Sequence, residues 1–93
     1  MKEINQPERH KYNCLFLPGL PGKIKRFSFF DDITDTGGKI YWLQYSGTYN
    51  NIGIDKFTID SSIHDIKESL DRLSKEGLPI LVIAYSYSTY LVN

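Results

Sequence analysis

The sequence predicts an α/β protein with a doubly wound, mostly parallel sheet between two layers of helices, a three-layer α/β/α arrangement. Three short runs of apolar or β-favouring residues, 12–17, 39–45 and 80–84, alternate with two longer segments of helical character. Runs that are nearly continuously apolar are typical of strands covered on both faces. Because crossovers of this length join parallel strands through right-handed connections, the three runs should lie in one sheet.

The composition allows one ordinary globular domain and excludes several classes of partner. Of 93 residues, 41% are hydrophobic and 14% aromatic, which is enough for a core. Eleven basic and eleven acidic residues cancel, so we expect no nucleic acid and no anionic membrane surface as partner. No apolar run approaches the roughly 18 residues of a membrane span.

The N-terminal residues and the cysteine count bear on the compartment. The first residues are polar and charged where a signal peptide needs an apolar stretch, so we expect a cytoplasmic protein. The single cysteine, Cys14, can form no intrachain disulfide and lies in an expected buried strand. We interpret it as a small core residue.

The first elements follow from local signals. We expect residues 1–11 to be a frayed tail and residues 12–93 to form the domain. Strand 12–17 should end at Pro18 and Gly19, which favour a turn.

A helix is expected over 23–33, because apolar side chains recur every three residues there: Ile24, Phe27, Phe30 and Ile33. The basic residues of this segment are interpreted as its solvated face rather than as an anion site: Lys23, Lys25 and Arg26. The β-rich strand 39–45 follows, and the polar segment 46–56 is expected to be a loop.

The helix over 61–76 has the strongest signals. Asp60 or Ser61 can cap its N-terminus, Gly77 terminates it and Pro79 bars its continuation. One apolar stripe runs along it: Ile63, Ile66, Leu70 and Leu73.

The last strand, 80–84, runs directly into Tyr85-Ser86-Tyr87-Ser88, where a short helix should start. In a nucleophile elbow, a serine occupies a tight turn between a buried strand and a helix. The residues two before and two after it are small, because the backbones crowd there. Ala84 and Ser88 meet this demand, although neither is glycine. The pattern is therefore small-x-Ser-x-small around Ser86.

A second landmark lies upstream. The pattern of residues 13–17 predicts a buried strand that runs into a glycine-bearing loop, Pro18-Gly19-Leu20-Pro21-Gly22. With the strand 39–45 and the serine turn following in order, the chain from about Asn13 to Asn93 resembles the α/β-hydrolase fold family. The resemblance implies that strand 13–17 lies between the other two strands.

The resemblance also implies site residues and an activity. Ser86 would be the nucleophile, and the backbone N–H groups of Tyr87 and Leu20 would hold the oxyanion. Pro21 has no N–H to offer, which leaves Gly22 as a fallback donor. Pro18 stands where the family commonly has a histidine. The substrate would be a small-molecule ester, thioester or related acyl compound, and no cofactor or metal is implied.

The family places its acid and histidine far downstream of the elbow, whereas this chain ends at Asn93. Neither His10, in the expected tail, nor His64, in a surface helix, occupies the family position. We therefore expect the N-terminal part of a serine hydrolase that is inactive alone: a gene fragment, a truncated chain or one half of a split protein. With strand 80–84 on a sheet edge, we expect self-association or a complementing C-terminal half.

Alternatives remain open at this point. Ser86 could be a structural serine on a strand end, within a non-catalytic scaffold or interaction protein, or in another strand-helix-strand fold. The nearby tyrosines could line an acyl pocket or serve as packing: Tyr85, Tyr87 and Tyr90. Phosphate-loop and dinucleotide-binding patterns fail at residues 18–22.

Overall fold

The computed structural model describes residues 1–20, 23–48 and 57–92 as a mixed α/β domain. Its elements follow in the order β1 (Lys2–Glu3), β2 (Tyr12–Leu17), α1 (Phe29–Asp35), β3 (Gly38–Trp42), α2 (Ile59–Ser74), β4 (Ile80–Ala84) and α3 (Tyr87–Val92). In this part of the chain, no helix is long and apolar enough to cross a membrane.

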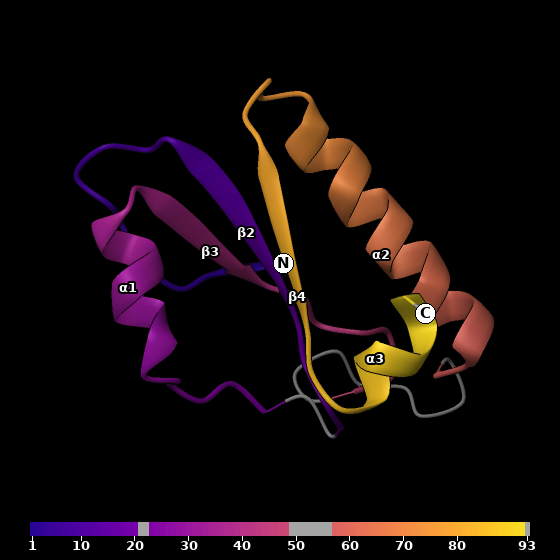
Figure 1. Cartoon of the computed structure of the whole chain (residues 1–93). Coiled ribbons are helices and arrows are strands. Elements are labelled where there is room, and N and C mark those ends of the chain that lie inside the picture. Colours follow the sequence, from indigo (N-terminus) through magenta and orange to yellow (C-terminus); the bar gives the residue numbers. More distant parts are fainter. Residues whose placement is uncertain (21–22, 49–56, 93) are drawn as a thin grey trace.

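The four strands form one mixed sheet in the order β1-β3-β2-β4 (Figure 1). Strand β2 pairs in parallel with both neighbours, so that Leu15 stands opposite Tyr41 on one side and Val82 on the other. The expected central position of this strand is confirmed. The short β1 pairs antiparallel with β3, so the sheet is not wholly parallel.

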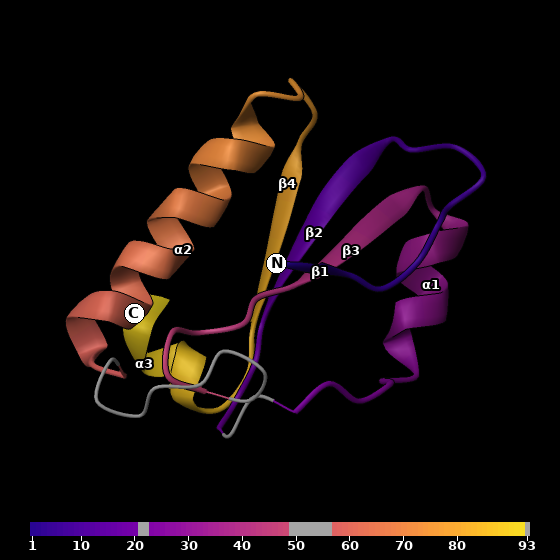
Figure 2. The same cartoon turned by 180° about the vertical axis from the view of Figure 1, so that it is seen from behind.

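Helices cover both faces of the sheet, as Figures 1 and 2 show from opposite sides. Helix α1 packs on one face, whose buried cluster is Cys14, Phe16, Phe30, Ile33, Ile40 and Trp42. Helices α2 and α3 lie on the other face, whose buried cluster is Leu15, Leu17, Leu43, Tyr45, Ile66 and Leu73. Successive β2 side chains serve opposite clusters, which explains why that strand is apolar almost throughout.

The N-terminal segment is not the frayed tail that we expected. Lys2 and Glu3 pair with β3, and the Ile4 N–H donates to the Ile40 carbonyl at 2.9 Å. The Asn5 amide group then donates to Thr34 Oγ1 at 2.6 Å, while its Oδ1 accepts from the Ile40 N–H at 2.7 Å. These bonds satisfy backbone groups of β3 that would otherwise stand unpaired on a sheet edge.

The helix expected over 23–33 was also wrong in its start, because α1 begins only at Phe29. Residues 23–28 are not helical. Phe27 packs its ring 5.2 Å from that of Phe16 and 6.2 Å from that of Trp42. The three-residue apolar repeat thus reflects aromatic packing on the sheet, which overrides helix propensity here.

Helix α2 begins earlier than predicted, and its N-cap is Thr58 rather than Asp60 or Ser61. The Thr58 hydroxyl accepts from the Ser61 N–H, and the Ser61 hydroxyl accepts from the Thr58 N–H, each at 2.9 Å. This reciprocal capping box satisfies two donors at the helix end. The strand predicted over 80–84 is confirmed, whereas most of the loop expected over 46–56 lies outside the described residues.

Candidate active site

The candidate site is the turn between β4 and α3. Ser86 has a φ of 54°. In the described part of the chain, it is the single residue other than glycine whose φ is positive. A left-handed conformation costs an L-residue roughly 1–2 kcal/mol, so the surrounding structure must enforce it. Strand β4 enters the turn with the Tyr85 N–H donating to the Leu17 carbonyl at 3.0 Å. The turn closes with the Thr89 N–H donating to the Ser86 carbonyl at 2.9 Å.

The loop after β2 lies against this turn. A Cβ atom added at Gly19 would stand 3.1 Å from Ser86 Cβ, 3.6 Å from Ser86 Oγ and 3.3 Å from the Tyr85 ring. A side chain at position 19 would require Ser86 or Tyr85 to shift by a few tenths of an ångström. Gly19 of the loop after β2 and Ser86 of the serine turn therefore lie close together.

Ser88 ties the turn to the rest of the core. Its side chain is fully buried, and its Oγ lies 2.5 Å from both the Pro18 carbonyl oxygen and the Tyr45 hydroxyl. A carbonyl can only accept, so Ser88 donates to Pro18 and Tyr45 donates to Ser88. The small residue two positions after Ser86 thus also carries a hydrogen-bond chain that joins α3, the loop after β2 and the segment after β3.

Sequence reasoning missed this chain of hydrogen bonds, which is a part of the site. The motif marked Ser88 as small but gave no sign that its hydroxyl has two buried partners. Burial raises the pKa of Tyr45 from its ordinary value of 10.0 to about 12, so its hydroxyl keeps its proton and remains a donor. In the sequence, the only available signal was a tyrosine at the end of the β-rich run 39–45 and a small hydroxyl residue two positions after Ser86.

The predicted oxyanion donors lie in the two segments that meet. Tyr87 is the first residue of α3, so the helix's own hydrogen-bond ladder does not use its N–H. Leu20 follows Gly19, and its side chain is 49% exposed. Pro21 and Gly22, the latter our fallback donor, lie outside the described residues.

Neither histidine of the chain is placed as a base for Ser86. His10 Nε2 lies 2.5 Å from Asn13 Oδ1, at the start of β2, whereas Ser86 follows the opposite end of the sheet. His64 is exposed on α2, with its Nε2 3.4 Å from Glu68 Oε2. Within the described ranges, no residue forms a hydrogen bond with the Ser86 hydroxyl.

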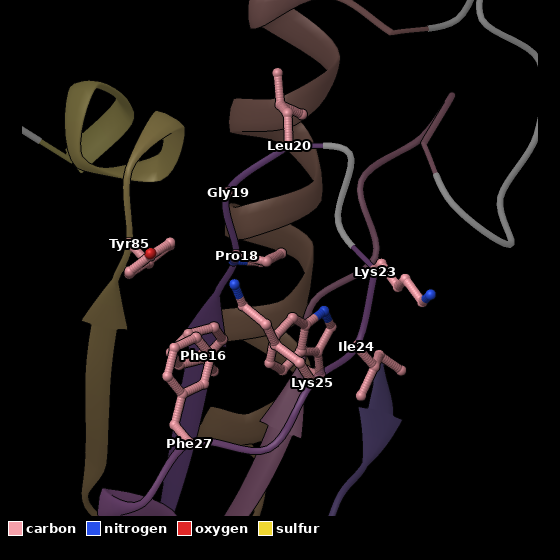
Figure 3. Close-up of a pocket in the computed structure, with 10 residues that line it drawn as sticks. Phe16, Pro18, Gly19, Leu20, Lys23, Ile24, Lys25, Phe27 and Tyr85 are labelled. Carbon is pink, nitrogen blue, oxygen red and sulfur yellow. The ribbon is translucent and has the colours of Figure 1, made fainter.

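A cavity of about 360 Å³ opens beside the turn (Figure 3). Its walls are Phe16, Pro18, Gly19, Leu20, Lys23, Ile24, Lys25, Phe27, Trp42 and Tyr85. Gly19 and Tyr85 are the residues that it shares with the surroundings of Ser86.

The tyrosines around the turn have different roles. Tyr85 lines the cavity, and its ring also packs 5.5 Å from that of Phe27. Tyr87 instead packs its ring against Tyr45, at 5.7 Å between centroids, and donates its hydroxyl to Ser62 Oγ at 3.1 Å. The Tyr90 side chain lies outside the described part of the structure.

Cys14 is fully buried next to Phe16 and takes no part in this site. Burial raises the pKa of its thiol from 9.0 to about 11, which keeps it protonated and unreactive near neutral pH. Its interpretation as a small core residue is consistent with this position.

Comparison with known proteins gives no relative: no family model, no curated protein and no solved structure matches this chain.

Proposed function

We propose that this chain is the N-terminal part of a serine hydrolase with a doubly wound α/β-hydrolase fold, acting on an ester, thioester or related acyl substrate. The observation that carries the proposal is the left-handed Ser86 between β4 and α3, with Gly19 packed directly against it. A strained non-glycine residue at a strand-to-helix turn is a feature that a purely structural turn could avoid by using glycine.

The proposed reaction starts with loss of the Ser86 hydroxyl proton to a base. The oxygen then attacks the substrate carbonyl carbon, and the N–H groups of Tyr87 and Leu20 donate to the oxyanion that forms. Collapse of this intermediate expels the alcohol or thiol, which takes the proton back from the base. Water then cleaves the acyl-serine by the same steps, which releases the carboxylic acid and restores the hydroxyl.

The base and its orienting acid must come from outside the described residues. We propose that they are supplied by polypeptide encoded beyond Asn93 or by a second chain, and that this chain alone is inactive. The proposal includes no cofactor, and it places the protein in the cytoplasm, which its single buried thiol fits.

The experiment is ester hydrolysis by the completed protein, which carries the acid and the histidine in the same or a second chain. With a short-chain p-nitrophenyl ester, Ser86→Ala should lower kcat/KM by about a thousandfold or more. His64→Ala is the matched control and should leave the rate unchanged, because His64 is exposed and paired with Glu68. A completed protein that hydrolyses no ester or thioester would overturn the proposal.

A second candidate function is a non-catalytic scaffold that docks a partner at the β4 edge. Leu81 and Val82 are 44% and 41% exposed, unusually high for apolar residues of a strand next to the sheet centre. The paired Leu81→Lys and Val82→Lys substitutions should then abolish concentration-dependent association in sedimentation experiments. Ile59→Lys, at a more exposed apolar position on α2, should not. A chain that sediments only as a 10.8 kDa monomer would show that the β4 edge does not join two copies of the chain, and it would count against a truncated fold.

A further inference from the structure

The cavity beside the turn has an aromatic floor. The rings of Phe16 and Trp42 stack with centroids 4.5 Å apart, and the Phe27 ring lies 5.5 Å from that of Tyr85. A volume of about 360 Å³ lies within the range of small-molecule sites, roughly 300–1,000 Å³. The cavity can therefore accept the apolar body of a small ligand, such as an aryl group or a short aliphatic chain.

One cation is placed over this floor. Lys25 Nζ lies 5.4 Å from the Phe27 ring centroid and 5.6 Å from that of Tyr85. Figure 3 shows its side chain reaching toward Pro18 and Tyr85, whereas Lys23 points away from the cavity. The expected helix would have put both lysines on a solvated face, but this segment is not helical.

The ammonium group of Lys25 has no anionic partner in the described part of the chain. The neighbouring Arg26 is paired with Asp31, but no carboxylate pairs with Lys25 and no described acceptor takes a hydrogen bond from it. An ammonium offers three N–H donors, and the ring faces satisfy only its electrostatic attraction to π-electrons. Water reaches these donors at the cavity mouth, and an anionic ligand group there would replace it with a charge-assisted hydrogen bond.

We propose that this cavity binds a small amphiphilic anion, with its aromatic or short aliphatic body on the aromatic floor and its anionic group at Lys25. Binding requires neither Ser86 nor a downstream base, so the site stands independently of the proposed hydrolysis. If that hydrolysis also holds, the shared residues Gly19 and Tyr85 make the bound anion a part of the substrate.

The chain contains a built-in reporter for this test, because Trp42 is its single tryptophan and lines the cavity. The probes are 4-phenylbutyrate and its neutral counterpart 4-phenylbutan-1-ol, titrated while tryptophan fluorescence is followed. One charge-assisted interaction should make the carboxylate bind about tenfold more tightly than the alcohol. Added salt should reduce that preference, because the ammonium is open to solvent at the mouth.

Variants test whether the charge of Lys25 itself, rather than the positive charge of the whole segment, sets the preference for the carboxylate. Lys25→Gln should remove the preference for the carboxylate and leave the affinity for the alcohol unchanged. Lys23→Gln, the same substitution two residues away, should keep the preference, because Lys23 belongs to the cavity wall but points its ammonium away from the cavity. Lys25→Glu should reverse it in favour of 4-phenylbutylamine, and near-ultraviolet circular dichroism should show that each variant keeps its packed aromatic core.

Three results would overturn the inference. The first is that neither probe produces a saturable change in fluorescence. The second is that both probes bind the native protein equally. The third is that Lys23→Gln weakens carboxylate binding as much as Lys25→Gln does. None of them bears on the reactivity of Ser86, so failure of this site and failure of the hydrolase proposal can be told apart.

Discussion

The hydroxyl groups of Tyr45 and Ser88 lie 2.5 Å apart in the protein core, and the Ser88 hydroxyl donates a hydrogen bond to the Pro18 carbonyl, also at 2.5 Å. Residues from three separate segments are thus joined by one serine oxygen. The carbonyl can only accept, which fixes the direction of both hydrogen bonds. Removing the hydroxyl of Ser88 and removing that of Tyr45 should therefore lower the free energy of unfolding by different amounts.

Ser88→Ala should destabilise the protein more than Tyr45→Phe does. The alanine leaves both the Tyr45 hydroxyl and the Pro18 carbonyl buried without a partner, a loss of about 2–3 kcal/mol in the free energy of unfolding. The phenylalanine leaves the Ser88 donor satisfied and should cost about 1 kcal/mol. Urea unfolding measures both, and a larger loss in Tyr45→Phe would contradict the assigned directions.

Gly19→Ala should damage the site itself, because the new Cβ would meet Ser86 Cβ at 3.1 Å. We expect a loss of roughly 1–3 kcal/mol in stability and at least a tenfold drop in ester hydrolysis by the completed protein. Gly77→Ala is the matched control. Its φ of 72° strains an alanine by about 1 kcal/mol, but no atom lies within 4 Å of the added Cβ. Hydrolysis unaffected by Gly19→Ala would argue against contact between the loop and the nucleophile.

Ser86→Gly should stabilise the protein by about 0.5–1 kcal/mol, since glycine adopts the φ of 54° without steric cost. The same change at Ser74, the last residue of α2, should lower stability by a similar amount. Thermal unfolding of the two variants provides the comparison. If Ser86→Gly were destabilising like Ser74→Gly, the turn would not be strained.

Stability should fall at alkaline pH through Cys14 and Tyr45. Burial raises the pKa of both groups in the folded state, to about 11 and about 12. Above their ordinary values of 9.0 and 10.0, the unfolded chain loses these protons first, so the unfolded state is favoured as pH rises. Below pH 9.0 the contribution of Cys14 is fully present.

The measurement is urea unfolding between about pH 8 and about pH 11. Cys14→Ala and Tyr45→Phe should each make the alkaline decline shallower, whatever they do to stability at neutral pH. If stability declined as steeply with pH in both variants as in the unsubstituted protein, other groups would be the cause of the decline.

The strand pattern could be predicted from the sequence because it is local. Strands 12–17 and 80–84 follow from apolar runs, whereas the central position of the former was implied by the family resemblance. The same local signals failed for 23–33, where the repeat is set by packing of Phe27 on Phe16, a contact across the chain. Local propensity carries no information about such a contact.

The remaining errors also concern partners that are distant in sequence. Residues 1–11 were expected to fray because nothing in them signals the bonds of Asn5 to Thr34 and Ile40. In the site, too, features set by neighbouring residues were predicted and features set by distant partners were missed. The turn at Ser86 was predicted from small neighbours in the chain, whereas the donation of Ser88 to Pro18 depends on how two loops meet.

The central claim is that Ser86 is a nucleophile whose base lies outside the described residues, and site-resolved labelling with a fluorophosphonate tests it most directly. Mass spectrometry after digestion separates Ser86 from Ser74, an exposed serine on α2. The account predicts no label on Ser86 in this chain alone, because oxyanion donors without a base leave the hydroxyl weakly nucleophilic. It predicts stoichiometric label on Ser86, and none on Ser74, once the acid and histidine are supplied. A completed protein in which Ser86 stays unlabelled would contradict the account and leave Ser86 as a structural residue of a scaffold.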